Sequence, residues 1–168
     1  PMRLARVLAF TDPFASEVVL NAGWQLSNSL ISIGQGGWLG VGLGNSFQKS
    51  FFLPEAHTDF IFAILVEELG IIGGMILISL FIILFIGLIS ISFDSFKKGR
   101  LFQGYIVFGT FLLIAIQMLF NIAVNIGLLP TKGLTLPFIS YGGTSIIIML
   151  SLIGIVLRTV SYTHLTLP

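Results

Sequence analysis

The sequence predicts an all-α polytopic membrane protein, in which a large extracytoplasmic loop with short helices precedes three transmembrane helices. Two observations carry this prediction. Only 9% of the 168 residues are charged, whereas soluble domains carry about a quarter. No charged residue occurs in the three segments 69–93, 101–131 and 133–157. Because each segment exceeds the roughly 20 apolar residues that cross a bilayer core, each predicts one membrane span.

Composition also excludes several classes of protein. The net charge is +1 and the basic residues form no extended patch, which argues against binding to nucleic acid. The chain has no cysteine, so it forms no disulfide and no cysteine-based metal site. It begins with proline and shows no signal peptide. We therefore expect a piece of a longer protein.

The uncharged segment 18–48 differs from the predicted spans. Gly, Ser, Asn and Gln interrupt it repeatedly, which favours loops and short interfacial helices over a membrane span. Within it, "GQGGWLGVGLGN" (Gly34–Asn45) matches no phosphate-binding loop and no dinucleotide fingerprint. We expect its glycines to let the backbone approach another part of the molecule closely.

A short helix is predicted from Asp59 to Gly70, at the outer surface and leading into the first span. Thr58 is the expected N-cap, and Asp59 then lies in the first turn. Gly70, with the glycines at 73 and 74, would let the helix bend before the span. One long continuous helix is the alternative.

The loops predict the orientation of the three spans, which we place at about 71–93, 101–126 and 144–157. Lys97, Lys98 and Arg100 crowd the short connection after the first span, and Arg158 follows the third. Cytoplasmic loops carry such an excess of positive charge. The region 1–58 is therefore expected on the outer side, and region 59–159 in the membrane.

The last nine residues, "VSYTHLTLP" (Val160–Pro168), show no clear pattern. They resemble an in-frame translation of a transposon-type sequencing adapter. We expect the third helix to be finished before them and treat 160–168 as a non-native tail, with a short native tail as the alternative.

The stretch "LPEAHTDFIF" (Leu53–Phe62) holds the strongest candidates for chemistry. It places Glu55, His57 and Asp59 within five positions, ahead of an apolar run. At a helix N-terminus the macrodipole favours an ionised carboxylate, so Asp59 is a candidate general base; a helix-capping aspartate is the alternative. Glu55 and His57 are interpreted as water-facing neighbours, with His57 able to orient Asp59. The three residues could also form a metal site, although so short a cluster of carboxylates and histidine is a weak signal for one.

Two further groups of polar residues stand out. Four cations are expected on the outer side: Arg3, Arg6, Lys49 and Lys132. Together they could neutralise a phosphate or diphosphate, whereas any one of them alone more commonly binds lipid headgroups or is solvated. In the second span, Gln117, Asn121 and Asn125 recur every four residues and so share one helix face. Such a stripe usually bonds to neighbouring helices; a substrate pathway is the alternative.

Two long motifs resemble a known family. "GWQLSNSLISIGQGGWLGVGLGNSFQKSFFLPEAHTDFIFAILVEELG" and "NIAVNIGLLPTKGLTLPFISYGGTS" closely resemble the SEDS family of shape, elongation, division and sporulation proteins, which polymerise peptidoglycan. The resemblance runs from Arg3 to about Arg158. "PTKGLTLP" is more similar to the division and sporulation branch (FtsW/SpoVE) than to the elongation branch (RodA).

This resemblance implies a fold of ten transmembrane helices, of which the chain would carry the last three and the external loop before them. It implies a glycosyltransferase of the bacterial cytoplasmic membrane that joins the disaccharides of lipid II on the outer face. Asp59 matches the essential aspartate of the family's "HTDF" motif. Arg3, Arg6, Lys49 and Lys132 match commonly basic positions; with Glu55 and His57 they are the expected substrate-binding residues.

The implied partners are lipid II, a class B penicillin-binding transpeptidase, divisome proteins and membrane lipid. No cofactor is assigned, although a divalent cation could hold the diphosphate in place of the basic residues. Two other functions stay open: a flippase for the lipid-linked precursor, and a scaffold that only activates a partner transpeptidase. A carboxylate beside cations favours the polymerase, since a flippase has little need of a base.

Overall fold

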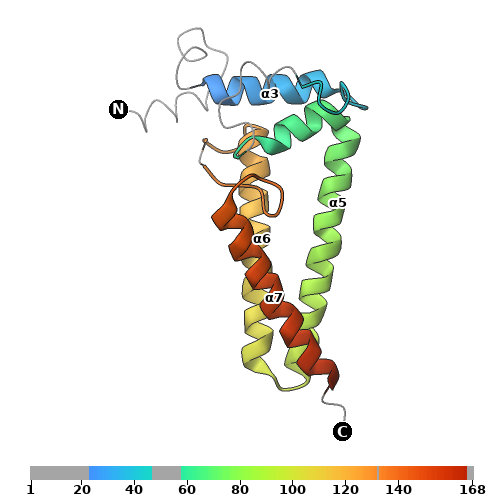
Figure 1. Cartoon of the computed structure of the whole chain (residues 1–168), viewed down its shortest axis with the longest axis vertical. Helices are drawn as coiled ribbons and strands as arrows, with labels where there is room; N and C mark the ends of the chain where they lie inside the picture. The colour runs from blue at the N-terminus through green and yellow to red at the C-terminus, as the bar shows by residue number, and fades with distance from the viewer. Residues whose placement is uncertain (1–22, 47–57, 132, 166–168) are drawn as a thin grey trace, which may run out of the picture.

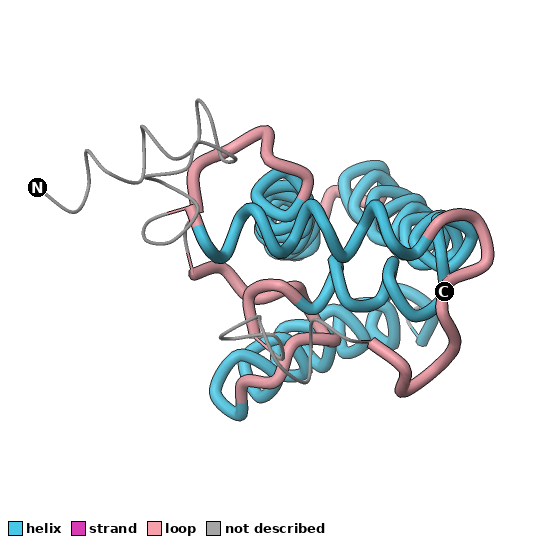
Figure 2. Tube along the Cα trace, turned by 90° about the horizontal axis from the view of Figure 1, so that it is seen from above, coloured by secondary structure: helices cyan, strands magenta, loops and turns pink. Residues whose placement is uncertain are grey.

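The computed structural model describes residues 23–46, 58–131 and 133–165, with the backbone alone for 161–165. Within these ranges the chain forms four helices and no strand: α3 (Trp24–Gly36), α5 (Ile61–Lys97), α6 (Leu101–Asn125) and α7 (Gly143–Leu165). The long part of α5, α6 and α7 run lengthwise through the molecule, and α3 lies across one end (Figures 1 and 2).

The three predicted spans are confirmed. Among the described residues, α5, α6 and the first 18 residues of α7 are long and apolar enough to cross a membrane. The end of α6 at Asn125 lies one residue from the prediction. Many large apolar side chains on these helices stay exposed, such as Ile83 at 66% and Leu119 at 62%. Such faces suit contact with lipid or with further helices.

The helix α5 breaks at Gly70, as predicted for a short helix leading into a span. Gly70 has φ 74° and ψ −176°, which is not helical. Figure 1 shows the short amino-terminal part of α5 crossing the end of the molecule before the long part turns along it. The alternative of one uninterrupted helix is therefore wrong.

The glycine-rich loop after α3 stabilises this break. Breaking a helix leaves carbonyl and N–H groups without intrahelical partners. The N–H groups of Val41 and Gly42 donate to the carbonyls of Glu67 and Glu68, at 2.9 and 3.1 Å. In the other direction, the N–H groups of residues 71 and 72 donate to the carbonyls of residues 37 and 38, at 2.9 and 3.3 Å. The expected close backbone approach is confirmed.

A second contact ties the same loop to α5. Glu67 is buried, and the hydroxyl of Ser46 donates to its carboxylate at 2.6 Å. A Cβ at Gly36 would overlap the carbonyl of Val66. The short helix α3, which the composition of 18–48 predicts in place of a span, is thereby packed directly against the first part of α5.

The third span does not end where the sequence analysis places it. We expect a helix end near Leu157, but α7 continues to Leu165. The physical reason is that residues 158–165 contain neither proline nor glycine, and the next proline is Pro168. No helix end therefore marks residue 160 as a boundary. The foreign origin of 160–168 and the division of the chain at 58 and 159 stay predictions.

The core joins all three spans and the loop before α7. Its buried apolar side chains come from α5, α6, the loop and α7: Phe62, Val66, Leu77, Phe81, Leu88, Val107, Ile114, Met118, Leu136, Met149 and Val156. Near the other end of α5, the hydroxyl of Ser92 donates to the carbonyl of Gly104 at 3.0 Å. Because Leu136 belongs to this core, the loop before α7 is packed against the spans.

Candidate functional site

Asp59 lies immediately before α5, and not in its first turn. The helix begins at Ile61 with Phe60 as the N-cap, and no side chain of the N-cap residue caps it. The predicted N-cap Thr58 is therefore wrong. Asp59 still stands beside the amino-terminal end of α5, where the helix dipole favours negative charge. The candidate role of Asp59 as a base therefore does not depend on Thr58 being the N-cap.

The amino-terminal end of α5 is capped from another helix. The side-chain carbonyl of Asn125 on α6 accepts the N–H of Ala63 at 3.1 Å. Ala63 carries one of the N–H groups that have no partner within the helix. The Asn125 amide donates to the Asp59 backbone carbonyl at 3.0 Å. One side chain thus holds the backbone on both sides of the point where α5 begins.

Asn121 binds the same carbonyl from one turn earlier on α6. Its amide donates to the Asp59 carbonyl at 2.9 Å and to the Leu134 carbonyl at 2.6 Å. Gln117, one further turn away, donates to the carbonyl of Thr135 at 3.0 Å. The stripe of Gln117, Asn121 and Asn125 therefore bonds to neighbouring segments, as the sequence analysis favours.

The loop before α7 packs against the Asp59 carboxylate. A Cβ added at Gly133 would lie 3.0 Å from Asp59 Oδ2, so the backbone of Gly133 approaches the carboxylate closely. Further along, the Ser140 hydroxyl accepts the N–H of Leu136 at 2.7 Å. The hydroxyls of Thr135 and Ser145 lie 3.2 Å apart, which links the loop to α7. The loop is thus anchored on both sides of its turn.

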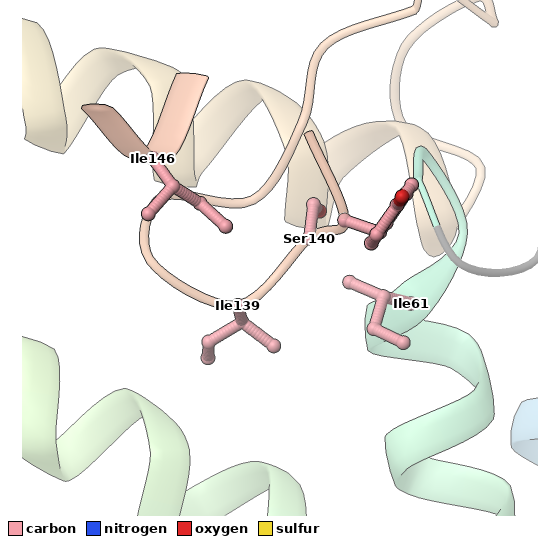
Figure 3. A pocket seen from close by; sticks show the side chains of 5 residues that line it. Ile61, Ile139, Ser140 and Ile146 are labelled. Carbon is pink, nitrogen blue, oxygen red and sulfur yellow. The ribbon is translucent and has the colours of Figure 1, made fainter. Parts of the chain in front are cut away.

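An open, mostly apolar cavity lies next to this end of α5. Its volume is about 400 Å³, and it is lined by Ile61, Ile139, Ser140, Tyr141 and Ile146. Figure 3 shows Ile61 of α5 opposite Ile139 and Ser140 of the loop, with Ile146 from the start of α7. Ile61 is two residues from Asp59. Asp59 is therefore two positions along the sequence from a residue that lines a cavity suited to an apolar group.

The other predicted site residues lie outside the described residues, so their predicted roles stay predictions: Arg3, Arg6, Lys49, Glu55, His57 and Lys132. Two of them are tied to the site by the chain itself. His57 is two positions before Asp59, and Lys132 precedes Gly133. In the part of the chain that the structure describes, no group of three or more His, Asp or Glu side chains could hold a metal ion.

Sequence reasoning missed Gly133 and the anchoring role of Asn121 and Asn125. The regular spacing of the two asparagines on one face indicates that they bond to something, but their partners lie 62 and 66 residues away along the chain. No pattern in the sequence around Gly133 marks it, because its importance comes from a residue that is distant in the sequence, Asp59, whose carboxylate lies beside it.

The comparison with protein families decides the identity of this fold. The family model of the FtsW, RodA and SpoVE proteins, described as "Cell cycle protein", matches residues 1–165. This chain belongs to the FtsW/RodA/SpoVE family. The SEDS resemblance of the two long motifs is confirmed, and the chain is part of a multi-pass membrane protein.

Similar curated proteins carry the description "Probable peptidoglycan glycosyltransferase FtsW". The one from Pseudomonas fluorescens is 48% identical over 167 residues, which are 98% of this chain and 40% of that protein. The one from Hahella chejuensis is 52% identical over 158 residues, 94% of this chain and 39% of that protein. This chain therefore spans about two fifths of the length of the curated relatives that it matches.

A solved structure shares the fold. One chain of a peptidoglycan synthase complex, described as coordinating polymerization and crosslinking, superposes with a TM-score of 0.72 and 28% identity. The match covers 98% of this chain and 43% of that chain. The all-helical fold of the described residues is therefore that of part of a polytopic SEDS protein.

Proposed function

We propose that the full-length parent of this chain is a peptidoglycan glycosyltransferase, which polymerises lipid II into glycan strands during cell division or sporulation. The observation that carries this proposal is Asp59 itself: two amides of α6 hold its backbone carbonyl, Gly133 lies beside its carboxylate, and Ile61, two residues later, lines an apolar cavity. The names of the curated relatives support the same activity. Polymerisation of lipid II by wild type and Asp59→Asn tests it.

Asp59 acts as the general base in the proposed reaction. A sugar hydroxyl of one substrate attacks the anomeric carbon of the other, and Asp59 takes the hydroxyl proton. A new C–O bond forms while the bond from the anomeric carbon to the diphosphate breaks, and the diphosphate leaves with the bonding electrons. In a single displacement the base lies on the face opposite the leaving group, by analogy with inverting glycosidases.

The leaving diphosphate requires positive charge. We assign this role to Arg3, Arg6, Lys49 and Lys132, with a divalent cation as the alternative. Lys132 suits the role because it adjoins Gly133, and the position of Gly133 is beside the Asp59 carboxylate. Glu55 and His57 precede Asp59 by a few positions and are proposed to contact the sugars. The apolar cavity lined by Ile61 suits the polyprenyl part of a lipid-linked substrate.

The flippase alternative loses support from the polar stripe of α6. A pathway for a polar headgroup would need side chains free to exchange partners with the substrate. The amides of Gln117, Asn121 and Asn125 instead donate to backbone carbonyls of the loop and of Asp59. Asn121 and Asn125 are also almost fully buried. The scaffold alternative offers no reason for two buried amides to hold the backbone of Asp59.

The proposed setting is the bacterial cytoplasmic membrane, with Asp59 on the outer face. Proposed partners are a class B penicillin-binding transpeptidase, divisome proteins and membrane lipid; no nucleic acid is involved. The solved structure that shares the fold supports a synthase partner, since that complex is described as joining polymerization to crosslinking.

This orientation predicts that Lys97 lies in the cytoplasm and Lys132 outside. Lys97, Lys98 and Arg100 lie in one short loop, and short loops with an excess of positive charge are typically cytoplasmic. Single cysteines at 97 and 132 in a cysteine-free full-length parent would be labelled in intact cells by an impermeant thiol reagent, with any outer membrane permeabilised. We expect labelling at 132 and none at 97 until the cells are lysed. The reverse pattern would show that the orientation is wrong.

A further inference from the structure

Two buried asparagines hold the backbone of Asp59 from one face of α6. Asn121 and Asn125 are 1% and 0% exposed. Both amides donate to the Asp59 carbonyl, at 2.9 and 3.0 Å. Two donors on a single carbonyl are more than backbone satisfaction requires, since one partner already meets it. The convergence of two side chains on this one atom indicates that its position matters.

The same pair fixes the surroundings of Asp59 as well. The side-chain carbonyl of Asn125 accepts the N–H of Ala63, so residues 59 and 63 are anchored by one side chain. Asn121 connects the Asp59 carbonyl to that of Leu134, the residue after Gly133. The same two side chains therefore hold the backbone of Asp59 and the loop residue that follows Gly133, the neighbour of its carboxylate.

The pair is itself held in place. The side-chain amide of Asn125 donates to the backbone carbonyl of Asn121 at 2.9 Å. The hydroxyl of Ser29 on α3 donates to the backbone carbonyl of Asn125, also at 2.9 Å. In a water-excluded site, each polar group that loses its hydrogen-bond partner is destabilising. Movement of either asparagine would break several bonds together, so the site behaves as one rigid unit.

We propose that Asn121 and Asn125 are positioning residues. By holding the backbone of Asp59, they place its carboxylate at the distance from the attacking hydroxyl that proton transfer requires. This inference rests on the proposed function, in which Asp59 is the base. Neither asparagine touches the substrate; each acts through the Asp59 backbone. A displacement of about 1 Å at a reacting group can lower a rate about 10²-fold.

The test measures kcat and KM for lipid II polymerisation by the purified full-length parent. Asn121→Ala and Asn125→Ala should each lower kcat by about 10- to 100-fold, with KM unchanged within about threefold because substrate contacts remain. Gln117→Ala is the matched control: it removes an amide on the same face of α6 that donates to the carbonyl and hydroxyl of Thr135. We expect its kcat to fall by less than about threefold.

Two further variants separate positioning from folding. Asn125→Asp keeps the oxygen that accepts the Ala63 N–H and removes the amide donor to Asp59. The new oxygen faces two carbonyls in a buried site and should lower the melting temperature. We therefore measure kcat well below the temperature at which this variant unfolds, and it should still fall there. Asp59→Glu places the carboxylate on a side chain that is one methylene longer. In this background, Asn121→Ala should lower kcat by less than about threefold relative to Asp59→Glu alone, because the effects of coupled residues are not additive.

The outcomes distinguish this inference from the function on which it rests. Wild-type rates in Asp59→Asn would refute the proposed function itself. Loss of activity in Asp59→Asn together with normal kcat in Asn121→Ala and Asn125→Asp would refute the positioning role alone. Equal losses for Asn121→Ala in the wild-type and Asp59→Glu backgrounds, or equal losses for Gln117→Ala, would also refute it, since these indicate a general structural effect.

Discussion

Replacing Gly70 by alanine should strongly destabilise the folded protein. Gly70 has φ 74° and ψ −176°, a backbone conformation that is essentially restricted to glycine. Holding another residue there costs about 1–3 kcal/mol. In addition, an alanine Cβ would overlap the carbonyl group of Trp38, which is fixed by its bond to the N–H of Ile72. Thermal melting of the purified full-length parent should show a clear decrease.

The chain offers a matched control on the same helix. Gly87 also lies in α5, and a Cβ there would meet nothing within 4 Å. Since alanine favours a helix over glycine by about 1 kcal/mol, Gly87→Ala should melt at or above the wild-type temperature. Gly40→Ala approaches the break from the loop side, at φ 78° and against the Glu68 carbonyl, and should resemble Gly70→Ala. If Gly70→Ala and Gly87→Ala melted alike, the break would not be fixed as described.

The spans could be predicted because the bilayer acts on every residue of a segment. A charge anywhere between Glu68 and Asp94, or between Arg100 and Lys132, would be costly in lipid, so its absence is visible directly. The bend at Gly70 could be predicted as well, since only glycine tolerates such a conformation easily. These features depend on single residues or on local composition.

The capping of α5 could not be predicted, because its partner is remote. Thr58 has the right chemistry for a local N-cap, but Asn125 supplies the acceptor from another helix. The pairing of loop 37–42 with the break likewise depends on how α3 lies against α5. Asp59 could be nominated from its motif, whereas the loop residue beside its carboxylate, Gly133, emerges only in three dimensions.

Asp59→Asn should nearly abolish glycan polymerisation. Asparagine keeps the size of the side chain but cannot accept a proton at neutral pH. The backbone contacts of Asn121 and Asn125 to residue 59 go to its carbonyl, so they survive the change. We therefore expect a rate lower by about 10²–10⁴, the range typical for loss of a general base, with membrane insertion and folding intact. Lys49→Ala should act differently, mainly by weakening binding of the donor lipid.

The most direct test is polymerisation of lipid II by the purified full-length parent, comparing wild type, Asp59→Asn and Glu68→Gln. Glu68→Gln is the control, because it neutralises a carboxylate in the first part of α5, nine positions after Asp59. The bond of Glu68 to Gly42 goes through its backbone carbonyl and survives the change. The predicted result is glycan strands from wild type and Glu68→Gln, and almost none from Asp59→Asn. Polymerisation by Asp59→Asn at close to the wild-type rate would contradict the catalytic role of Asp59.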